Sequence, residues 1–414
     1  MMRLLFSMMF FCGCIWNAMA QGFLKSVDEY PFVKYELNRI QIPSHDSSRL
    51  DLFYAKLDSV VLCRKSKVNV LHIGGSHVQA DIFSNQVRLN MDSLNLDLKT
   101  SRGLIFPFSV AKTNNPSNYK VKYKGQWKHE KNVSRKHNTR LGMTGIAVTT
   151  QDTSAEICVH LNPSDSLKRW EFDQLRILGY AEDGCVEPQL RIDSAHYLTG
   201  SFDSLTSSYL FEMPEPTDSF TVIFTQQDTL PHPFTLTGFL PMNEEDGVVY
   251  HSIGVNGASV PSYLRCEDLE RDLNLIKPDL VVFGIGINDA SGRNFSDSLF
   301  IANYGRLIEH IEAVSPNCAY IFVTNNDSYR RIRRGRYQVN KNGVLAKQAF
   351  YKLAERHKAG VWDLFEIMGG LSSMPNWEKA GLAKKDKIHF TIKGYALIGD
   401  LFYNALISSY LKKE

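Results

Sequence analysis

The chain has 414 residues, 43% of them hydrophobic, so it can bury a large core and is long enough for two domains. Its formal net charge at pH 7 is only +3. A strong nucleic-acid binder carries more clustered basic charge, so we expect no nucleic-acid partner.

The first twenty residues have the pattern of a secretory signal peptide. Arg3 supplies the positive start, residues 4–16 are apolar but too few to span a bilayer, and Ala18-Met19-Ala20 is a small-x-small cleavage site. A lipoprotein signal around Cys14 is the competing interpretation. We expect export to the periplasm or the cell exterior, and no later segment is long and apolar enough for a transmembrane helix.

Cysteines and metal-binding motifs give little guidance. Five cysteines follow the leader, an odd number, so at least one is unpaired. Cys158 and Cys185 both fall in a β-rich region and pair in one interpretation, whereas in the other all five are buried thiols. The sequence has no CxxC, HExxH or EF-hand spacing, so we expect no metal site.

The first part of the mature chain contains a candidate nucleophile. Apolar spacing predicts a helix over 46–61, and a buried strand over 68–73 is broken by two glycines. Ser76 then opens a second helix that runs to about Leu94, so its hydroxyl lies beside unpaired N–H groups, which suits a nucleophile. Gly-Gly-Ser is also an ordinary turn, and this stretch alone leaves both interpretations open.

The pattern of apolar residues changes between Tyr119 and Tyr250. Short alternating or β-branched runs, about eight of them, are separated by turn residues without a helical period. This pattern predicts an all-β sandwich. Residues 118–250 are too many for a connection within a compact domain, so we expect an inserted domain between residues 21–117 and 251–414.

Strands and helices alternate again after residue 251. The candidate strands, with the one before Ser76, lie near Val68, Ile253, Leu280, Ala319 and Val361, and the candidate helices over 262–275, 298–314, 342–357 and 392–411. This alternation predicts an α/β fold with a doubly wound, five-stranded parallel sheet.

Polar residues follow two of these later elements. Asn288 comes just after the strand that begins near Leu280, and Asp386 lies three residues before His389. A serine, an amide and an Asp/His pair near the carboxyl ends of strands fit one crevice of an open α/β sheet. Taken singly, the Asp/His pair could be a solvated loop pair and Asn288 a helix cap.

Together these groups resemble the SGNH, or GDSL, hydrolase superfamily. Its four blocks match at Gly74-Gly75-Ser76-His77, Gly254-Val255-Asn256-Gly257-Ala258, Gly286-Ile287-Asn288-Asp289 and Asp386-Lys387-Ile388-His389. The resemblance implies the flavodoxin-like SGNH fold and no cofactor. One position departs from the family, whose first block has an acid where this chain has Gly75. That acid belongs to a supporting loop, so its loss leaves reduced activity open.

The resemblance also implies a role for each site residue. Ser76 is the nucleophile, His389 the general base and later the general acid, and Asp386 the group that orients the imidazole. The oxyanion hole consists of the backbone N–H groups of Ser76 and Gly257 and the side-chain amide of Asn288. We expect a glycine at 257 because the backbone approaches closely there.

A narrower resemblance is to the peptidoglycan O-acetylesterase type. It rests on residues 71–81, the Gly103–Pro107 loop, the Gly254–Ala258 block and His389-Phe390-Thr391. In that type a carbohydrate-binding-module-like jelly roll is inserted after the serine block, which fits 118–250. The resemblance implies an exported serine esterase that removes acetyl groups from muramic acid O-6. The alternatives are an acetylesterase or acetyltransferase on another polysaccharide, and a non-catalytic glycan-binding protein.

Two basic regions are candidates for holding an anionic glycan. The first is 120–140, with the aromatic residues Tyr123 and Trp127, and the second is the arginine-rich run 330–336, which follows a strand end. Solvated surface charge is the simpler explanation of each. Of the histidines near Ser76, His72 is expected in the core and His77 is at most a substrate-lining residue.

Overall fold

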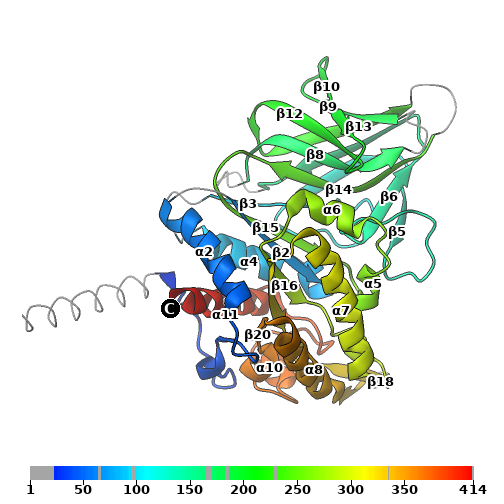
Figure 1. Ribbon diagram of the computed structural model, residues 1–414. Helices are drawn as coiled ribbons and strands as arrows, with labels where there is room; N and C mark the ends of the chain where they lie inside the picture. Colours follow the sequence, from blue (N-terminus) through cyan, green and yellow to red (C-terminus); the bar gives the residue numbers. More distant parts are fainter. Residues whose placement is uncertain are drawn as a thin grey trace, which may run out of the picture.

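The computed structural model describes residues 23–412 apart from 64–66, 93, 95–98, 164–169, 182–185, 227–231 and 334. The predicted signal peptide at residues 1–20 lies outside the described residues, as does Cys185. The rest folds into an α/β part and a β region, which lies above the α/β part in Figure 1. In the described ranges, no helix combines the length and apolar content that crossing a membrane requires.

The central sheet of the α/β part has seven strands, not the five predicted. In spatial order they are β1 (Ile40–Gln41), β20 (Gly360–Trp362), β17 (Ala319–Val323), β16 (Leu280–Gly284), β2 (Lys67–Gly74), β15 (Gly247–Gly254) and β3 (Lys99–Ser101). The five predicted strands are the central ones, and they run parallel. Of the two edge strands, β1 pairs antiparallel with β20 and β3 pairs parallel with β15. Both are too short to show a periodic pattern in the sequence.

Helices cover both faces of this sheet. One face carries α2 (Ser48–Cys63), α4 (Ile82–Met91) and α11 (Ile392–Leu411), and the other carries α6 (Leu269–Ile276), α7 (Asp297–Val314) and α8 (Asn342–His357). Successive residues of a strand point to opposite faces of the sheet, as the two-residue period requires. Val70 packs in the core under α2, α4 and α11, and Leu71 packs in the core under α6, α7 and α8. Burial on both faces explains the continuous apolar runs of the predicted strands.

The described residues also form several shorter helices and a hairpin, and the sequence analysis missed all of them except α3 and α5, which are parts of predicted helices. They are η1 (Tyr35–Leu37), α3 (Ser76–Gln79), α5 (Val260–Tyr263), η2 (Asp289–Ser291), the hairpin of β18 (Tyr329–Arg333) and β19 (Arg336–Val339), α9 (Leu364–Ile367) and α10 (Met374–Lys379). Two predicted helices are broken. The one that opens at Ser76 divides into α3 and α4 at Asp81, whose φ is +49°. The one expected over 262–275 divides into α5 and α6.

The β region consists of two antiparallel sheets. The first has five strands, β10 (Tyr197–Thr199), β9 (Val186–Arg191), β13 (Ser219–Gln226), β7 (Ser154–His160) and β4 (Lys120–Lys124). The second has six strands, β11 (Ser201–Asp203), β12 (Ser208–Thr217), β8 (Phe172–Ala181), β14 (Phe234–Met242), β6 (Ile146–Thr150) and β5 (Lys128–Lys131). Strand β15 begins at Gly247, inside the range predicted for the insert, and belongs to the central sheet.

The cysteines of the described residues do not form the proposed pair. Cys158, Cys266 and Cys318 are free, and the latter two are buried. The interpretation that pairs Cys158 with Cys185 is therefore not supported, and buried Cys266 and Cys318 act as small apolar residues.

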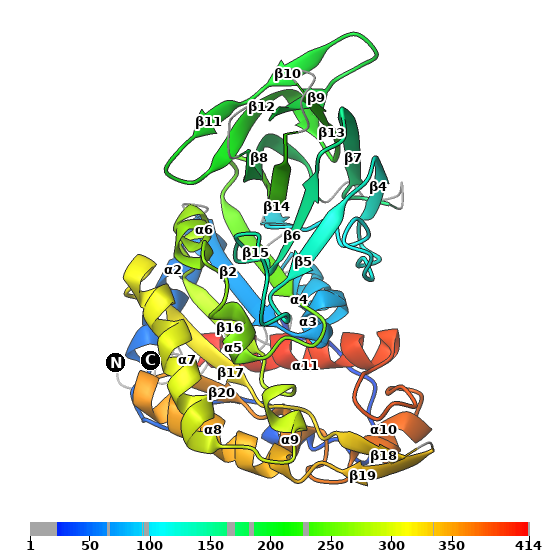
Figure 2. The same ribbon diagram turned by 90° about the vertical axis from the view of Figure 1, so that its right-hand side faces the viewer.

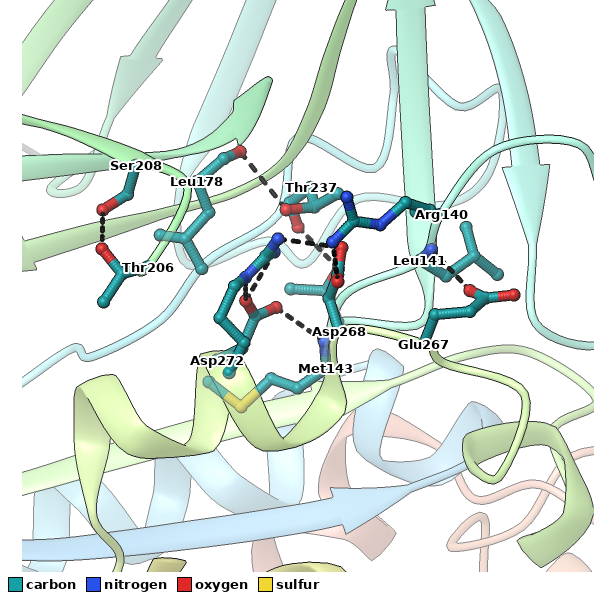
Figure 3. A network of polar contacts seen from close by, with 12 residues as sticks. Arg140, Leu141, Met143, Leu178, Thr206, Ser208, Thr237, Glu267, Asp268 and Asp272 are labelled. Carbon is teal, nitrogen blue, oxygen red and sulfur yellow. Dashed lines mark hydrogen bonds and ion pairs between the residues drawn. The ribbon is translucent and has the colours of Figure 1, made fainter. Parts of the chain in front are cut away.

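The β region and the α/β part share one apolar core. Ile157 and Phe239 of the β region and Leu307 of α7 belong to the same cluster of buried side chains. A polar network lies at the border (Figure 3), where Arg140 pairs with Asp268, and the Met143 N–H donates to Asp272 Oδ2 at 2.9 Å. The border is thus fixed by both packing and directional contacts.

Candidate active site

Ser76 lies where the sequence analysis placed it, at the junction of β2 and a helix. Strand β2 ends at Gly74, and Ser76 is the first residue of α3. The first N–H groups of a helix have no acceptor within it, so the backbone N–H of Ser76 remains available. The Ser76 hydroxyl is 2.8 Å from His389 Nε2, although the two residues are 313 positions apart.

His389 is held by the short turn that contains Asp386. Asp386 Oδ2 is 2.8 Å from His389 Nδ1, and its Oδ1 accepts the backbone N–H groups of Ile388 and His389, each at 2.9 Å. Burial raises the pKa of the Asp386 carboxyl, but the hydrogen bonds from His389 and Ile388 outweigh it and hold that pKa well below its usual value. Asp386 is therefore a carboxylate at neutral pH, with its lone pairs aimed at the imidazole.

Three neighbouring parallel strands bring the remaining candidate groups together. Ser76 follows β2, Gly257 follows β15, and Asn288 follows β16, and both β15 and β16 pair with β2. The carboxyl ends of parallel strands share one edge of the sheet, so their following loops meet there. Asn288 Nδ2 donates to Ala258 O at 2.8 Å. That bond uses one amide hydrogen and orients the amide, which leaves the second hydrogen free to donate.

Gly257 is required for a different reason from the one predicted. A Cβ built on it would meet only Val133 Cγ1, at an ordinary 3.9 Å, so close backbone approach does not demand a glycine there. Its φ of +83° does, because residues with a side chain rarely adopt that conformation. Among the described residues, no acceptor takes the N–H of Gly257.

Gly75, the departure from the family pattern, is close to the same groups. A Cβ at this position would lie 3.2 Å from Asn288 Nδ2 and 3.4 Å from Ala258 O. Its φ is −98°, so the backbone itself does not call for a glycine. Any larger residue here would press on the amide that Ala258 O orients.

Gln79 is a positioning residue that the sequence analysis did not single out. Its buried side chain accepts the Asn256 N–H at 2.7 Å and donates to Thr113 Oγ1 at 3.2 Å. It therefore ties α3 to the loop that carries Gly257. The sequence offered one sign of this role, because Gln79 is a polar residue three positions after Ser76, on the inward side of a short helix.

A buried ion cluster holds the turn after α3. Asp81 Oδ2 lies 2.6 Å from Arg102 Nη2, and Asp81 Oδ1 lies 3.4 Å from Arg88 Nη2. Burial raises the pKa of the Asp81 carboxyl, but the two arginines and Asn118 outweigh it, so that pKa is lowered overall. The cluster explains why Asp81 keeps a left-handed backbone and breaks the predicted helix.

The two histidines near Ser76 differ in exposure, since His72 is buried and His77 is only partly buried. His72 is fully buried, as predicted, and contacts Tyr250 Oη through Nδ1 at 3.1 Å. His77 Nδ1 lies 2.7 Å from Tyr395 Oη, and burial lowers the pKa of His77 to about 3. His77 is therefore neutral at pH 7 and packs beside His389, at 5.2 Å between ring centroids, and its role as a substrate-lining residue stays a prediction.

The first basic region borders a large hollow in the β region. This hollow of about 730 Å³ is lined by Tyr123, Trp127, Lys128 and His129, together with Lys112 from the preceding loop. In the described part of the chain, no cluster of three or more histidine, cysteine or acidic side chains is arranged to hold a metal ion.

The loop that lines this hollow also reaches the candidate site. Asn114, two residues after Lys112, accepts from Gln79 Nε2 at 3.2 Å and from Asn256 Nδ2 at 2.6 Å. One loop therefore contacts both the hollow and the residues that position the segment of Gly257.

Comparisons with known proteins bear on the family of part of the chain and on the fold. The model of the GDSL-like Lipase/Acylhydrolase family matches residues 218–397, which include Gly257, Asn288, Asp386 and His389 but not Ser76. The solved structure of a peptidoglycan O-acetylesterase has a similar fold, with a TM-score of 0.70 and 19% identity over 90% of this chain and 99% of that chain.

Two further solved structures match a smaller part of the chain. A lipase/acylhydrolase from Enterococcus faecalis is 24% identical over 40% of this chain and 78% of its own, with a TM-score of 0.31. An acetyl xylan esterase is 20% identical over 40% of this chain and 83% of its own, also with a TM-score of 0.31. No curated protein matches the sequence significantly. The family match leads to the conclusion that residues 218–397 belong to a GDSL-like lipase/acylhydrolase domain and that the protein is an ester hydrolase.

Proposed function

We propose that this hydrolase removes O-acetyl groups from a carbohydrate, with O-acetylated peptidoglycan as the expected substrate. The observation that carries the proposal is the 2.8 Å contact between Ser76 Oγ and His389 Nε2, next to oriented N–H donors. The likeness in fold to a peptidoglycan O-acetylesterase, over 90% of the chain, supports the substrate class.

The first half of the reaction forms an acetyl-enzyme. Ser76 Oγ attacks the acetyl carbonyl carbon while His389 Nε2 takes the hydroxyl proton. The oxyanion that develops accepts hydrogen bonds from the N–H groups of Ser76 and Gly257 and from Asn288 Nδ2, where one such donor is worth about 3–4 kcal/mol. His389 then gives its proton to the sugar oxygen, which leaves as a free hydroxyl.

The second half returns the enzyme to its starting state. A water molecule gives a proton to His389 Nε2 and attacks the acetyl carbon. The same donors hold the second oxyanion, and its collapse releases acetic acid as the proton on His389 returns to Ser76 Oγ. The acetic acid then ionises to acetate in water. Asp386 stays ionised throughout, and its charge stabilises the imidazolium in both halves.

We propose export for the same protein. The sequence pattern of residues 1–20 supports it, because a positive start, a short apolar core and a small-x-small site form a secretory leader. A peptidoglycan substrate lies outside the cytoplasm, which is consistent with that leader. Mass spectrometry of the secreted or periplasmic protein should find Gln21 as its first residue, and a retained leader would contradict this part of the proposal.

Glycan binding without catalysis is the second candidate function. The hollow of about 730 Å³ favours it, because Tyr123 is partly exposed there and a tyrosine ring can stack on a sugar face. The two functions are compatible in one protein, since the hollow belongs to the β region and Ser76 to the α/β part. Glycan binding would be the protein's sole function only if Ser76 proves inert.

Acetate release tests the proposed function directly. We expect the wild type to hydrolyse 4-nitrophenyl acetate and the Ser76→Ala variant to show only the background rate. Ser59→Ala is the matched control, because the Ser59 hydroxyl donates to Ala55 O at 3.3 Å within α2, away from the candidate site, and the variant should keep full activity. Equal background rates for the wild type and Ser76→Ala would leave only the glycan-binding function.

The substrate is tested by comparing polymers. We expect free acetate from O-acetylated peptidoglycan at a higher kcat/KM than from acetylated xylan. Measuring free acetate, rather than loss of substrate, separates hydrolysis from transfer of the acetyl group to a second sugar. A clear preference for acetylated xylan would contradict the peptidoglycan assignment while leaving the esterase chemistry intact.

A further inference from the structure

The β18–β19 hairpin is attached to the turn that carries the catalytic pair. The Tyr329 N–H, at the start of β18, donates to Lys387 O at 3.1 Å. Asn326 Nδ2, just before the hairpin, donates to Ile388 O at 3.0 Å. Lys387 and Ile388 are the two residues between Asp386 and His389, so the hairpin is hydrogen-bonded to the backbone next to the general base.

The base of the hairpin is anchored on its other side as well. Arg330 Nη1 donates to Gly292 O at 3.0 Å, and the Asn340 N–H closes the hairpin by donating to Ser328 O at 2.8 Å. Figure 2 shows the β18–β19 hairpin projecting at the lower right of the molecule. The hairpin is therefore fixed at its base and extends outward beside the candidate site.

The outer part of the hairpin is strongly positive. Arg331, Arg333 and Arg336 are exposed, and within the described residues no carboxylate lies within ion-pair distance of any of them. These three side chains therefore keep their guanidinium groups available to a ligand.

The catalytic turn adds positive charge next to the hairpin. The Lys387 ammonium lies 5.2 Å from the Tyr329 ring centroid and 6.0 Å from that of Tyr337, so it packs against the hairpin. Lys384 and Lys385, on the same turn, are exposed. The nearby acids are already engaged, because Asp386 binds His389, and Glu378 lies 3.6 Å from Lys387. The net charge beside His389 is thus positive.

We propose that the β18–β19 hairpin binds carboxylate groups that the substrate carries near its acetylated sugar, so that the enzyme prefers acidic acetylated glycans to neutral ones. This inference rests on the proposed deacetylation at Ser76. Guanidinium groups form paired, charge-assisted hydrogen bonds with carboxylates, and a fixed hairpin presents them without much loss of backbone freedom. Positive charge at the rim also raises the local concentration of an acidic substrate at low salt.

The test compares one pair of variants on one pair of substrates. The hairpin variant is Arg331→Gln/Arg333→Gln, and the matched control is Arg306→Gln/Arg356→Gln, which removes two exposed arginines from α7 and α8. The substrates are soluble O-acetylated peptidoglycan fragments and the same fragments with their carboxylates converted to amides. All proteins are also assayed on 4-nitrophenyl acetate, which has no carboxylate.

We expect the hairpin variant to lose about fivefold in kcat/KM on the acidic fragments, mainly through KM, since exposed ion pairs are individually weak. Its rates on the amidated fragments and on 4-nitrophenyl acetate should match those of the control variant. The wild-type preference for acidic fragments should shrink as salt is raised, because salt screens exposed charges.

Two outcomes would overturn the proposal, and they differ from failure of the proposed function. Equal wild-type kcat/KM on acidic and amidated fragments would remove the role of the carboxylates. Equal losses in the hairpin and control variants would show that the arginines are only solvated surface charge. If the wild type releases acetate from neither fragment, the proposed function fails, and this proposal fails with it.

Discussion

Replacing Asp386 with asparagine should change which nitrogen of His389 carries the proton. In the protein, Asp386 Oδ1 accepts two backbone N–H groups at 2.9 Å, and Oδ2 faces His389 Nδ1 at 2.8 Å. The variant has only one amide oxygen, and facing it toward the two backbone donors satisfies more hydrogen bonds than facing it toward the ring. The amide NH₂ then points at Nδ1, which can only accept, so the ring proton moves to Nε2.

The expected loss of rate follows from two contributions. Two backbone hydrogen bonds, at about 1 kcal/mol each, favour the unreactive tautomer by roughly 2 kcal/mol. Loss of the charge-assisted bond from Asp386 to the imidazolium removes roughly 2–3 kcal/mol more from the transition state. Together these give a fall in kcat of about 10³ to 10⁴, in the range known for loss of a triad acid.

The assay is steady-state hydrolysis of 4-nitrophenyl acetate, with unfolding curves to show that each variant is folded. Asp400→Asn is the matched acid-to-amide control, because Asp400 on α11 accepts from Gln86 and Asn90, which are not part of the candidate site. Ser76→Ala gives the background rate. If folded Asp386→Asn kept more than about a tenth of the wild-type kcat, the tautomer argument would be refuted.

Three further substitutions probe the groups around the expected oxyanion. Asn288→Ala should lower kcat by about 100- to 1,000-fold with little change in KM, as steady-state kinetics would show. Gly257→Ala should cost about 1–2 kcal/mol in the free energy of unfolding, measured by denaturant titration, because its φ is +83°. Burial raises the pKa of Asp289 from 3.8 to about 7, while the Val260 N–H lowers it. The folded state therefore binds this proton more tightly than the unfolded state, and the stabilisation is complete below pH 3.8 and lost as pH rises through about 7. Unfolding curves at several pH values give the free energy of unfolding as a function of pH. Asp289→Asn should remove the part of that pH dependence that Asp289 contributes.

The central sheet could be predicted because burial on both faces leaves a strong pattern. Strand β16 is a continuous apolar run and β2 is mostly apolar, and both end in glycine, with Ser76 and Asn288 in the segments that follow them. The chain order of Ser76, Asn288 and His389 indicated a shared crevice because the carboxyl ends of parallel strands share an edge. No local pattern encodes the 2.8 Å contact across 313 positions, which depends on how α11 packs against the sheet.

The breaks in the predicted helices depend on contacts that are distant in sequence. Asp81 interrupts the helix after Ser76 because Arg88 and Arg102 pair with its buried carboxylate, and Arg102 comes from beyond α4. The second predicted helix is interrupted between Tyr263 and Leu269, where Asp268 pairs with Arg140 of the β region. Apolar spacing continued through both positions, so periodicity alone could not find either break.

The β18–β19 hairpin was expected only as an arginine-rich loop. Five of its eleven residues, 329–339, are arginines, and the apolar alternation that identifies half-buried strands is absent. Gly335, with a φ of +73°, was the available sign of a tight turn. What holds the hairpin is the hydrogen bond from Tyr329 to Lys387, a contact with the catalytic turn that composition does not reveal.

The β region is better understood as one wall of the candidate site than as a separate binding module. Its loop after β5 brings Val133 to within 3.9 Å of where a Cβ on Gly257 would lie, and Arg265, just after α5, donates to Asn132 O at 2.6 Å. Trp170 packs on the Arg88 guanidinium, 5.7 Å from its ring centroid, and Arg88 in turn pairs with Asp81 behind α3. Because these contacts support the segments that carry Ser76 and Gly257, we expect the β region to set the shape of the candidate site, whether or not its own hollow binds a glycan.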